Sequence, residues 1–404
     1  MPDKRAIETV EKDVLSVYQA ENPSNYRLDR DEVEFARHEA RLGRRLRDNL
    51  KFPTRMFRGA SLLDVGAGTG ERTVFYSRWG ARCTLADMNP DALARARIIF
   101  DRFAPPDHQA RFVEGSLFDL SLPDTYDLVV CNGVLHHTAD KERGFAHVAR
   151  YVGHDGYFML GIGNRAGYFQ ANLQRLVLYH YAKTPEAIEA LAPRFFPERL
   201  ERAVRLGGRT ERAIIYDSYV NPKIDTPTVA DVLRWFRDAG LALYSSWPPV
   251  LPPFLADSPG QASLAEISTH PLLGVIPELF WLSHTVDDAD ALAEYWQTAR
   301  ELADVMAPAV DAIGDVTPAF ALDIPAFEER IDRFDQLAEA AWSQNRLLPV
   351  NASLRRLFEE IRGMLSLLRG NADAEAMAGF LQTCRVLFRG THGLGASYFI
   401  GHRA

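Results

Sequence analysis

The pattern of apolar and polar positions between residues 61 and 164 alternates between short strands and amphipathic helices. Helical segments over 71–79 and 90–103 separate the first three apolar runs, and the second helix opens with Pro90 near its first position. Strands that alternate with helices in this way predict an α/β fold with a mostly parallel sheet and helices on both faces. The apolar runs typical of its strands are SLLDV, ARCTLADMN, ARFVEGSLFDL, YDLVVCNGVLHH and GYFMLGIGN.

The whole chain divides into four predicted regions. They are an N-terminal helical lid, a core with a helical insertion at about 165–227, a mainly helical region that is a lid or a dimer surface, and a C-terminal strand that returns to the sheet. A capping box at Thr228 and Asp231 is expected to start the helix after the insertion. The bounds of the four regions are 1–55, 56–247, 248–389 and 390–404.

Composition and charge narrow the functional classes. The 404 residues are 47% hydrophobic and 25% charged, which is typical of a folded globular protein. The formal charge of -8 does not favour binding to phosphate backbones, so no nucleic acid partner is expected, and the Arg-rich stretch 37–47 is expected to be a solvated helix face. No apolar run reaches the roughly 18 residues of a membrane helix, so no membrane partner is expected.

The cysteines and the N-terminal residues indicate the cellular compartment in which the protein is expected. Cys83, Cys131 and Cys384 lack the spacing of metal ligands and are expected to be reduced thiols. The charged N-terminus has no signal-peptide core. These features predict a cytoplasmic protein without a metal site.

A glycine-rich loop follows the first strand and opens a helix. Gly66, Gly68 and Gly70 let the backbone approach a ligand and adopt positive φ. A nicotinamide dinucleotide fingerprint needs its third glycine where this chain has Glu71, and an acid there disfavours a pyrophosphate at the helix N-terminus. Adenosylmethionine carries no phosphate, and Asp87 at the end of the second strand can accept both hydroxyls of its ribose.

These segments resemble the successive motifs of class I, Rossmann-like S-adenosylmethionine-dependent methyltransferases. The resemblance rests on LLDVGAGTG, LADMNP, VEGSLFDL, YDLVVCNGVLHHT and YFMLGIGN. It covers about 62–164 and resumes loosely at 228–247. It implies a seven-stranded sheet whose last strand is antiparallel, and SYFIGH is the candidate for that strand.

The same resemblance implies that S-adenosyl-L-methionine is the cofactor. The glycines would line its methionine part, Asp87 would bind ribose, and Met88 would pack on adenine. Asp119 would receive the adenine amino group, and Asp64 is expected to hold the loop or, through water, the methionine ammonium. Asn132 and Gly133 would lie under the sulfonium. The expected cofactor residues are Asp64, Gly66, Ala67, Gly68, Thr69, Gly70, Asp87, Met88, Ser116, Leu117, Phe118, Asp119, Asn132, Gly133 and Val134.

Candidate catalytic residues follow the fourth and fifth strands. His136 and His137 come at the carboxyl end of the fourth strand, where open α/β sheets bind ligands. One of them is a candidate for the base that takes a proton from a hydroxyl or amine, and the alternative is that both form the pocket wall. Tyr168 follows the fifth strand and faces the same edge. Adjacent histidines rarely direct both rings to one ion, so no metal is expected.

Together these features predict a methyltransferase. It would transfer a methyl group by in-line displacement to an oxygen, nitrogen or carbon atom of a small molecule, because two long insertions suit a covered pocket. A protein or RNA acceptor, a modified adenosylmethionine and a non-catalytic cofactor-binding module are the alternatives left open. The expected partners are the methyl acceptor and, if residues 248–389 form a dimer surface, a second copy of the chain.

Overall fold

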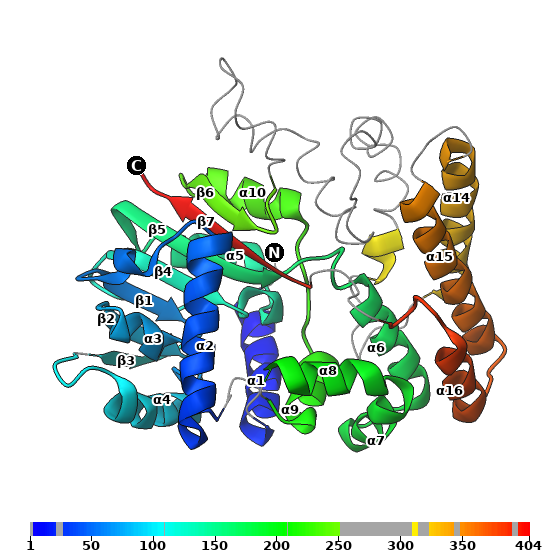
Figure 1. The fold of residues 1–404 in the computed structure, drawn as a ribbon, viewed down its shortest axis with the longest axis horizontal. Coiled ribbons are helices and arrows are strands. Elements are labelled where there is room, and N and C mark those ends of the chain that lie inside the picture. Colours follow the sequence, from blue (N-terminus) through cyan, green and yellow to red (C-terminus); the bar gives the residue numbers. More distant parts are fainter. Residues whose placement is uncertain are drawn as a thin grey trace, which may run out of the picture.

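A seven-stranded sheet forms the centre of the protein, with strand order β3-β2-β1-β4-β5-β7-β6 (Figure 1). The structure is a computed structural model that describes residues 3–21, 27–108, 110–207, 209–250, 309–313, 323–342, 348–389 and 395–404. Only β7 runs antiparallel to its neighbours, so the predicted mostly parallel sheet is confirmed. The strands are β1 (Ser61–Val65), β2 (Arg82–Asp87), β3 (Arg111–Glu114), β4 (Tyr126–Asn132), β5 (Val152–Gly163), β6 (Ala242–Trp247) and β7 (Ala396–His402).

Hydrophobic cores lie on both faces of this sheet. Neighbouring residues of a strand point to opposite faces, and on β1 both Leu62 and Leu63 are fully buried. Leu62 packs in a cluster with side chains of α2, α3 and α4, whereas Leu63 packs with α5 and α10. These helices are α2 (Glu32–Arg44), α3 (Thr73–Arg78), α4 (Pro90–Phe103), α5 (Lys141–Ala149) and α10 (Val229–Asp238).

Local sequence signals set the ends of these helices. Asn89 caps α4, with Pro90 in its first turn, and α4 covers the predicted range. Thr228 and Asp231 form the predicted capping box at the start of α10. Gly240 follows α10 with a φ of 69°, a conformation that favours glycine, and the chain then enters β6.

The C-terminal strand β7 lies between β5 and β6. It pairs with β5 from Tyr157 opposite His402 to Gly163 opposite Ala396, and with β6 up to Trp247. Its backbone is therefore paired on both sides, as the apolar run SYFIGH indicates.

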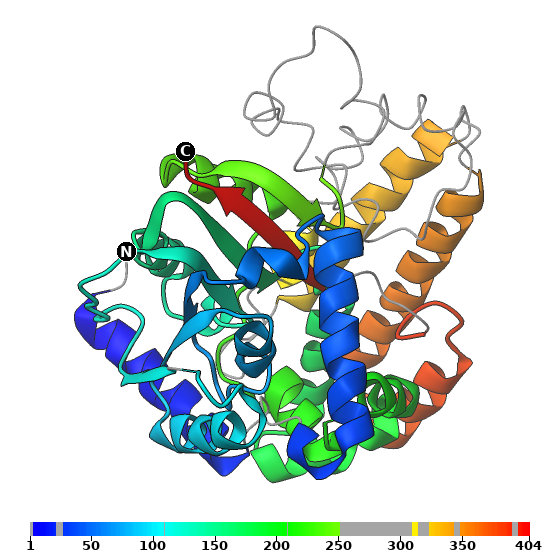
Figure 2. The ribbon, with the colours of Figure 1, turned by 60° about the vertical axis from the view of Figure 1, so that its left-hand side comes forward.

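A third hydrophobic core lies beside the sheet and joins two regions that are distant in sequence. Phe169 of α6 has its ring centroid 6.4 Å from that of Phe327 in α14 and 6.3 Å from that of Phe358 in α15. Figure 2 shows α14 and α15 side by side at the edge of the molecule. The predicted regions separate the insertion from the helices after residue 248, but the described helices of both share this core. Its elements are α6 (Phe169–Tyr181), α7 (Pro185–Phe195), α8 (Pro197–Gly207), α9 (Glu211–Ile215), η5 (Tyr216–Val220), α14 (Ile324–Trp342), α15 (Leu348–Arg369) and α16 (Ala374–Thr383).

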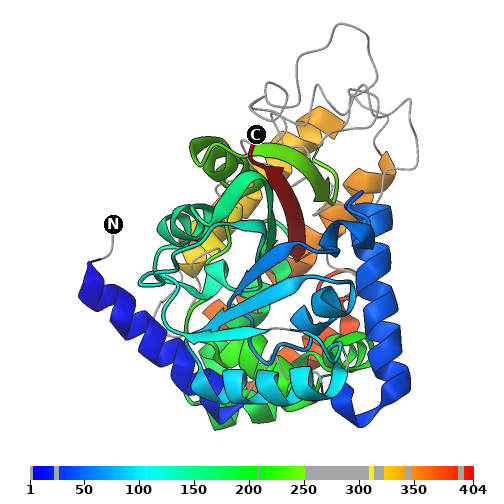
Figure 3. The ribbon, with the colours of Figure 1, turned by 90° about the vertical axis from the view of Figure 1, so that its left-hand side faces the viewer.

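Two N-terminal helices, α1 (Lys4–Ala20) and α2, lie on opposite sides of the molecule (Figure 3). Phe35 of α2 packs on the sheet helices, with its ring 4.2 Å from that of Phe103. The arginines of the stretch 37–47 are exposed, as expected, except Arg45, which is partly buried. Arg45 lies 4.6 Å from the ring centroid of Tyr398 and donates to its hydroxyl at 2.8 Å, so it holds the helix end on β7. The short segments nearby are η1 (Leu28–Arg30), η2 (Arg45–Asn49) and η3 (Thr54–Phe57).

None of the helices in the described ranges is long and apolar enough to cross a membrane.

Removal of residues 395–404 is expected to unfold the protein or make it insoluble. The deletion unpairs β5 and β6 along facing edges and removes the buried side chains of Phe399 and Ile400. Circular dichroism and size-exclusion chromatography measure the effect, and removal of Ala404 alone, beyond β7, is the control. A truncated protein that stays folded and unfolds at the same temperature as the full chain would contradict the account.

Candidate functional site

A cavity of about 440 Å³ lies at the carboxyl ends of β1, β2, β4 and β5. This is the edge where open α/β sheets bind ligands. Helix α1 and the insertion after β5 also contribute to its wall, so it is covered from two sides. The predicted site residues that line it are Asp64, Gly66, Ala67, Gly68, Thr69, Asp87, Met88, Leu117, Asn132, Gly133, Val134, His136, His137 and Tyr168.

The loop between β1 and α3 brings its backbone to this cavity. A Cβ on Gly66, whose φ is 73°, would lie 2.2 Å from Cγ2 of Val134, so a larger side chain cannot fit without movement. The N–H of Gly68 donates to Oδ2 of Asp87 at 2.7 Å and ties the loop to β2. Both contacts fix the backbone close to the space that a ligand would fill.

Gly70, the last glycine of the loop, packs closely against α4. A Cβ on Gly70 would lie 2.9 Å from Cβ of Ala96, so this glycine packs the loop against α4. It is not among the described residues that line the cavity. The observed role of Gly70 is packing, and its expected contact with the methionine part of a cofactor stays a prediction.

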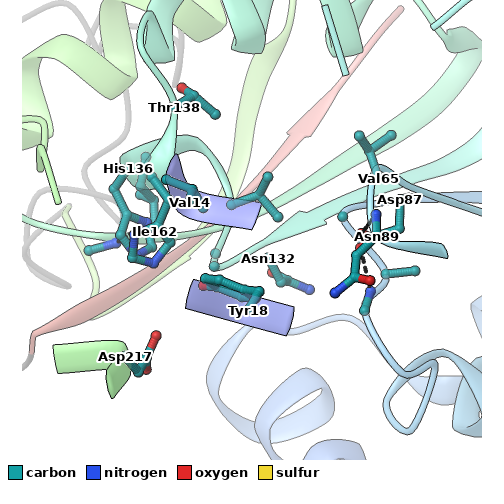
Figure 4. Close-up of a pocket in the computed structure, with 18 of the residues that line it drawn as sticks. Val14, Tyr18, Val65, Asp87, Asn89, Asn132, His136, Thr138, Ile162 and Asp217 are labelled. Atoms are coloured by element: carbon teal, nitrogen blue, oxygen red, sulfur yellow. Dashed lines mark hydrogen bonds between the residues drawn. The ribbon is translucent and has the colours of Figure 1, made fainter. Parts of the chain in front are cut away.

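Asp87 and Asn89 form a polar edge of the cavity (Figure 4). Oδ1 of Asp87 accepts from the N–H of Asn89 at 2.8 Å. Burial raises the pKa of Asp87, and the backbone donors of Asn89 and Gly68 oppose that rise. Oδ1 of Asn89 caps α4, whereas its Nδ2 is buried and has no hydrogen-bond partner within the described part of the chain. This edge thus offers a ligand both acceptors and a donor.

Asp64 lies at the inner end of β1 and is 5% exposed. It accepts a hydrogen bond from Oγ1 of Thr73 at 2.6 Å, which ties the strand to α3. Burial raises the pKa of Asp64 to about 7, and the bond from Thr73 opposes the rise. A cation bound in the cavity would therefore favour the charged carboxylate.

His136 and His137, in η4 (Leu135–His137), have opposite proton arrangements. Nδ1 of His137 lies 2.7 Å from the carbonyl oxygen of Lys223, which can only accept, so Nδ1 carries the proton and Nε2 keeps its lone pair. Nδ2 of Asn221 lies 3.1 Å from the same Nδ1, and the shorter carbonyl contact decides the tautomer. Nδ1 of His136 faces the N–H of Gly163 at 3.5 Å, which favours the proton on Nε2.

Burial lowers the pKa of both rings. The effect is strong for His136, which is 5% exposed, and His137 adds to it. For His137 the lowering is opposed by Asp217 and by the bond to the carbonyl of Lys223. His137 is therefore a neutral imidazole with a lone pair on Nε2, which is the form that a general base needs.

Tyr168 lines the cavity but is not suited to accept a proton. Burial raises its pKa to about 12, so its hydroxyl stays protonated and can donate a hydrogen bond. Tyr18 of α1 has its ring centroid 6.2 Å from that of His137, and burial also raises its pKa. Of the three catalytic candidates, His137 has the chemistry of a base.

The turn after β3 does not bring its predicted residues to the cavity, apart from Leu117. Oγ of Ser116 accepts a hydrogen bond from the N–H of Phe118 at 3.0 Å, so the turn folds on itself. The same hydroxyl donates to Oε1 of Glu11 in α1. Phe118 is buried beneath Arg143, and Asp119 is exposed. Ser116, Phe118 and Asp119 are not among the described residues that line the cavity, and their contact with adenine stays a prediction.

Two groups of lining residues were missed from the sequence. Helix α1 contributes Glu11, Val14, Leu15 and Tyr18. Their spacing of three and four residues was the available signal, because it places them on one helix face. The insertion contributes Arg175, Arg199, Arg209 and Asp217. Arg175 stands within the apolar run LQRLVL, and such a lone charge on a buried face is the signal there. Tyr26, a residue of the expected N-terminal lid, lies outside the described residues.

A metal site needs several ligating side chains close together in the described ranges. No group of three or more His, Cys, Asp or Glu side chains there could hold a metal ion.

One part of the chain is similar to known methyltransferases. Residues 63–160 match the family model of the methyltransferase domain. An uncharacterized methyltransferase of Bacillus subtilis is 29% identical over 100 residues, which are 24% of this chain and 39% of that protein. The mitochondrial ubiquinone biosynthesis O-methyltransferase of Schizosaccharomyces pombe is 32% identical over 102 residues, which are 24% of this chain and 37% of that protein. The chain thus spans less than half the length of these curated relatives.

Among solved structures, magnesium protoporphyrin IX methyltransferase from Synechocystis is 16% identical to this chain. The match covers 47% of this chain and 67% of that one, with a TM-score of 0.30.

His137 is expected to have a pKa below 6.5 and to carry its neutral proton on Nδ1. Burial disfavours the charged ring, so the pKa falls, and the carbonyl of Lys223 selects the tautomer. Nitrogen-15 NMR of the ring over a pH series measures both properties, with free imidazole in the same buffer as the reference. A midpoint above 6.5, or a neutral form protonated on Nε2, would show that the assigned hydrogen bond is wrong.

Proposed function

We propose that this chain, whose residues 63–160 match the methyltransferase domain model, transfers a methyl group from S-adenosylmethionine to a small molecule. The observation that carries the proposal is one covered cavity with two chemically different ends. The glycine loop and Asp87 line one end, and His137 lines the same cavity from η4.

The residues at the first end fit an adenosine and a methionine. A Cβ on Gly133, whose φ is 76°, would meet nothing within 4 Å, so the cavity reaches this backbone and leaves room for a ligand. Asp87 would hold the ribose hydroxyls with its remaining lone pairs, and Nδ2 of Asn89 would donate to the adenosine. Met88 and Leu117 line the cavity where the adenine ring would pack.

Charge at this end also suits the cofactor. Carboxylates of Glu11, Asp64, Glu71 and Asp87 line the cavity there, with Arg72 as the nearby cation. When bound, S-adenosylmethionine supplies an electrophilic methyl group on a sulfonium, and it also carries an ammonium. Asp64, with its pKa near 7, would become fully charged beside such a cation. The excess of carboxylates therefore favours a cationic ligand over a phosphate-bearing dinucleotide.

The protein's own residues would prepare the acceptor. His137 would take the proton of a hydroxyl or amine on Nε2, while its Nδ1 proton stays bound to the carbonyl of Lys223. Tyr168, which keeps its proton, would donate a hydrogen bond to the acceptor. Helix α1 and the insertion would exclude water and hold the two reactants in line.

Three observations support a small acceptor. The cavity volume of about 440 Å³ is within the usual range of small-molecule sites. Two covering elements, α1 and the insertion, contribute side chains to its wall, which suits enclosure of a metabolite. The fission-yeast relative is named as an O-methyltransferase of ubiquinone biosynthesis. We propose α1 as part of a lid within residues 1–55, and residues 248–389 as a further lid or a dimer surface.

Replacement Asp87→Ala is expected to weaken the binding of S-adenosylhomocysteine by about 1.5–3 kcal/mol, the usual loss for a hydrogen bond to a charged group. Calorimetry measures the affinity, and NADH is expected not to bind to the unaltered protein. Asp91→Ala is the matched control, because Asp91 is exposed on α4 and does not line the cavity. Tight NADH binding, or equal losses in the two variants, would sink the cofactor assignment.

A further inference from the structure

One end of the cavity has a wall of arginines that the cofactor proposal does not use. Arg175 of α6, Arg199 of α8 and Arg209 before α9 line the cavity, and Asp217 of η5 lies among them. All four side chains come from the insertion after β5. In Figure 4, Asp217 and Asp87 lie on opposite sides of Tyr18, so this wall is at the end away from the glycine loop.

Hydrogen bonds hold these guanidinium groups in place. Arg175 is 1% exposed, and its Nη2 donates to the carbonyl oxygen of Asn221 at 2.6 Å. Nε of Arg199 donates to the hydroxyl of Tyr219 at 3.1 Å. Nη1 of Arg209 lies 2.9 Å from Oδ2 of Asp217. The groups are therefore positioned before any ligand arrives.

Tyr168 lines the same cavity as the three arginines. Burial is the largest influence on its pKa, Asp217 raises it further, and Arg199, Arg209 and Arg175 all act in the opposite direction. All four charged groups line the cavity together with Tyr168, which agrees with these influences on its pKa.

Among the described residues that line the cavity at this end, positive charges outnumber negative ones. Three guanidinium groups face a single carboxylate there, that of Asp217, whereas carboxylates predominate at the end with the glycine loop. Bringing several like charges together in a covered site is costly unless an opposite charge joins them. An oxyanion at this wall would supply that charge, because guanidinium groups pair with carboxylates and phosphates in a planar, two-point geometry.

We propose that the methyl acceptor carries an oxyanion, a carboxylate or a phosphate monoester, bound by Arg199 and Arg209. The inference rests on the proposed function and names the substrate class of the same site. Asn221 links the wall to the candidate base, since its carbonyl accepts from Arg175 and its Nδ2 lies 3.1 Å from Nδ1 of His137. Arg199, Arg209 and His137 line the same cavity, so an acceptor anchored on the two arginines would present its hydroxyl or amine to His137.

The reaction balances with this placement. The bond between sulfur and the methyl carbon breaks as a bond from the acceptor oxygen or nitrogen to that carbon forms. The sulfur leaves with the electron pair as a neutral thioether, and the acceptor proton goes to Nε2 of His137. The oxyanion takes no part in these steps and serves to anchor the acceptor.

The test compares three probes that share a phenyl ring, on protein saturated with S-adenosylhomocysteine. Benzoate carries a carboxylate, phenyl phosphate carries a phosphate monoester, and benzamide is the neutral match for benzoate. Calorimetry at constant ionic strength measures each affinity. At least one anion is expected to bind tenfold or more tightly than benzamide, and the better of the two identifies the class of oxyanion.

Substitutions of the arginines test where in the cavity the anion binds. Arg199→Gln and Arg209→Gln are each expected to weaken the preferred anion about tenfold or more, the effect of losing a charge-assisted hydrogen bond, and to leave S-adenosylhomocysteine affinity within about twofold. Arg205→Gln is the matched control, because Arg205 is exposed on the same helix as Arg199 and does not line the cavity. Equal anion binding in all three variants would overturn the proposal.

The probe comparison uses the unaltered protein, so it decides the question even if a variant fails to fold. If neither anion binds better than benzamide while S-adenosylhomocysteine binds, the arginines only hold the insertion together and this inference is wrong. If S-adenosylhomocysteine itself does not bind, the proposed function fails instead.

Discussion

The two-sided pairing of β7 is the constraint on which the rest of the structure depends. A central antiparallel strand has its backbone groups satisfied only while both neighbours are present, so β5 and β6 must lie on either side of the end of the chain. Asn164, just after β5, binds β7 through its Nδ2 and Oγ of Ser397 at 2.9 Å. Ala396 and Tyr398 of the same strand line the cavity. The sheet and the site are therefore completed together.

That constraint also explains where the added helices lie. The chain leaves the sheet after β5 to form α6–α9, and leaves it again after β6 before returning as β7. Both excursions start and end near the carboxyl ends of the strands, and their helices share one hydrophobic core. The helices α6–α9, which contribute to the wall of the cavity, therefore pack against α14–α16. Side chains such as Arg175 keep their positions because the helices that carry them are packed on their other faces.

The parts of the fold governed by local sequence were predictable. Alternating apolar runs and the cap residues Asn89 and Thr228 place strands and helices, and a parallel sheet then brings the glycine loop, Asp87 and the two histidines to one edge. What could not be predicted depends on long-range contacts. The role of Gly70 depends on Ala96, and the proton arrangement of His137 depends on a carbonyl in the insertion. Neither partner is recognisable from the sequence around those residues.

The central claim is that this cavity brings a methyl donor and a small acceptor to His137. The most direct test incubates the protein with adenosylmethionine carrying a labelled methyl group and a cell extract, and then separates small molecules from protein and RNA. The account predicts label in the small-molecule fraction, with at least about a hundredfold less from His137→Gln, although that variant still binds S-adenosylhomocysteine. Label in protein or RNA, no transfer at all, or full transfer by His137→Gln would contradict it.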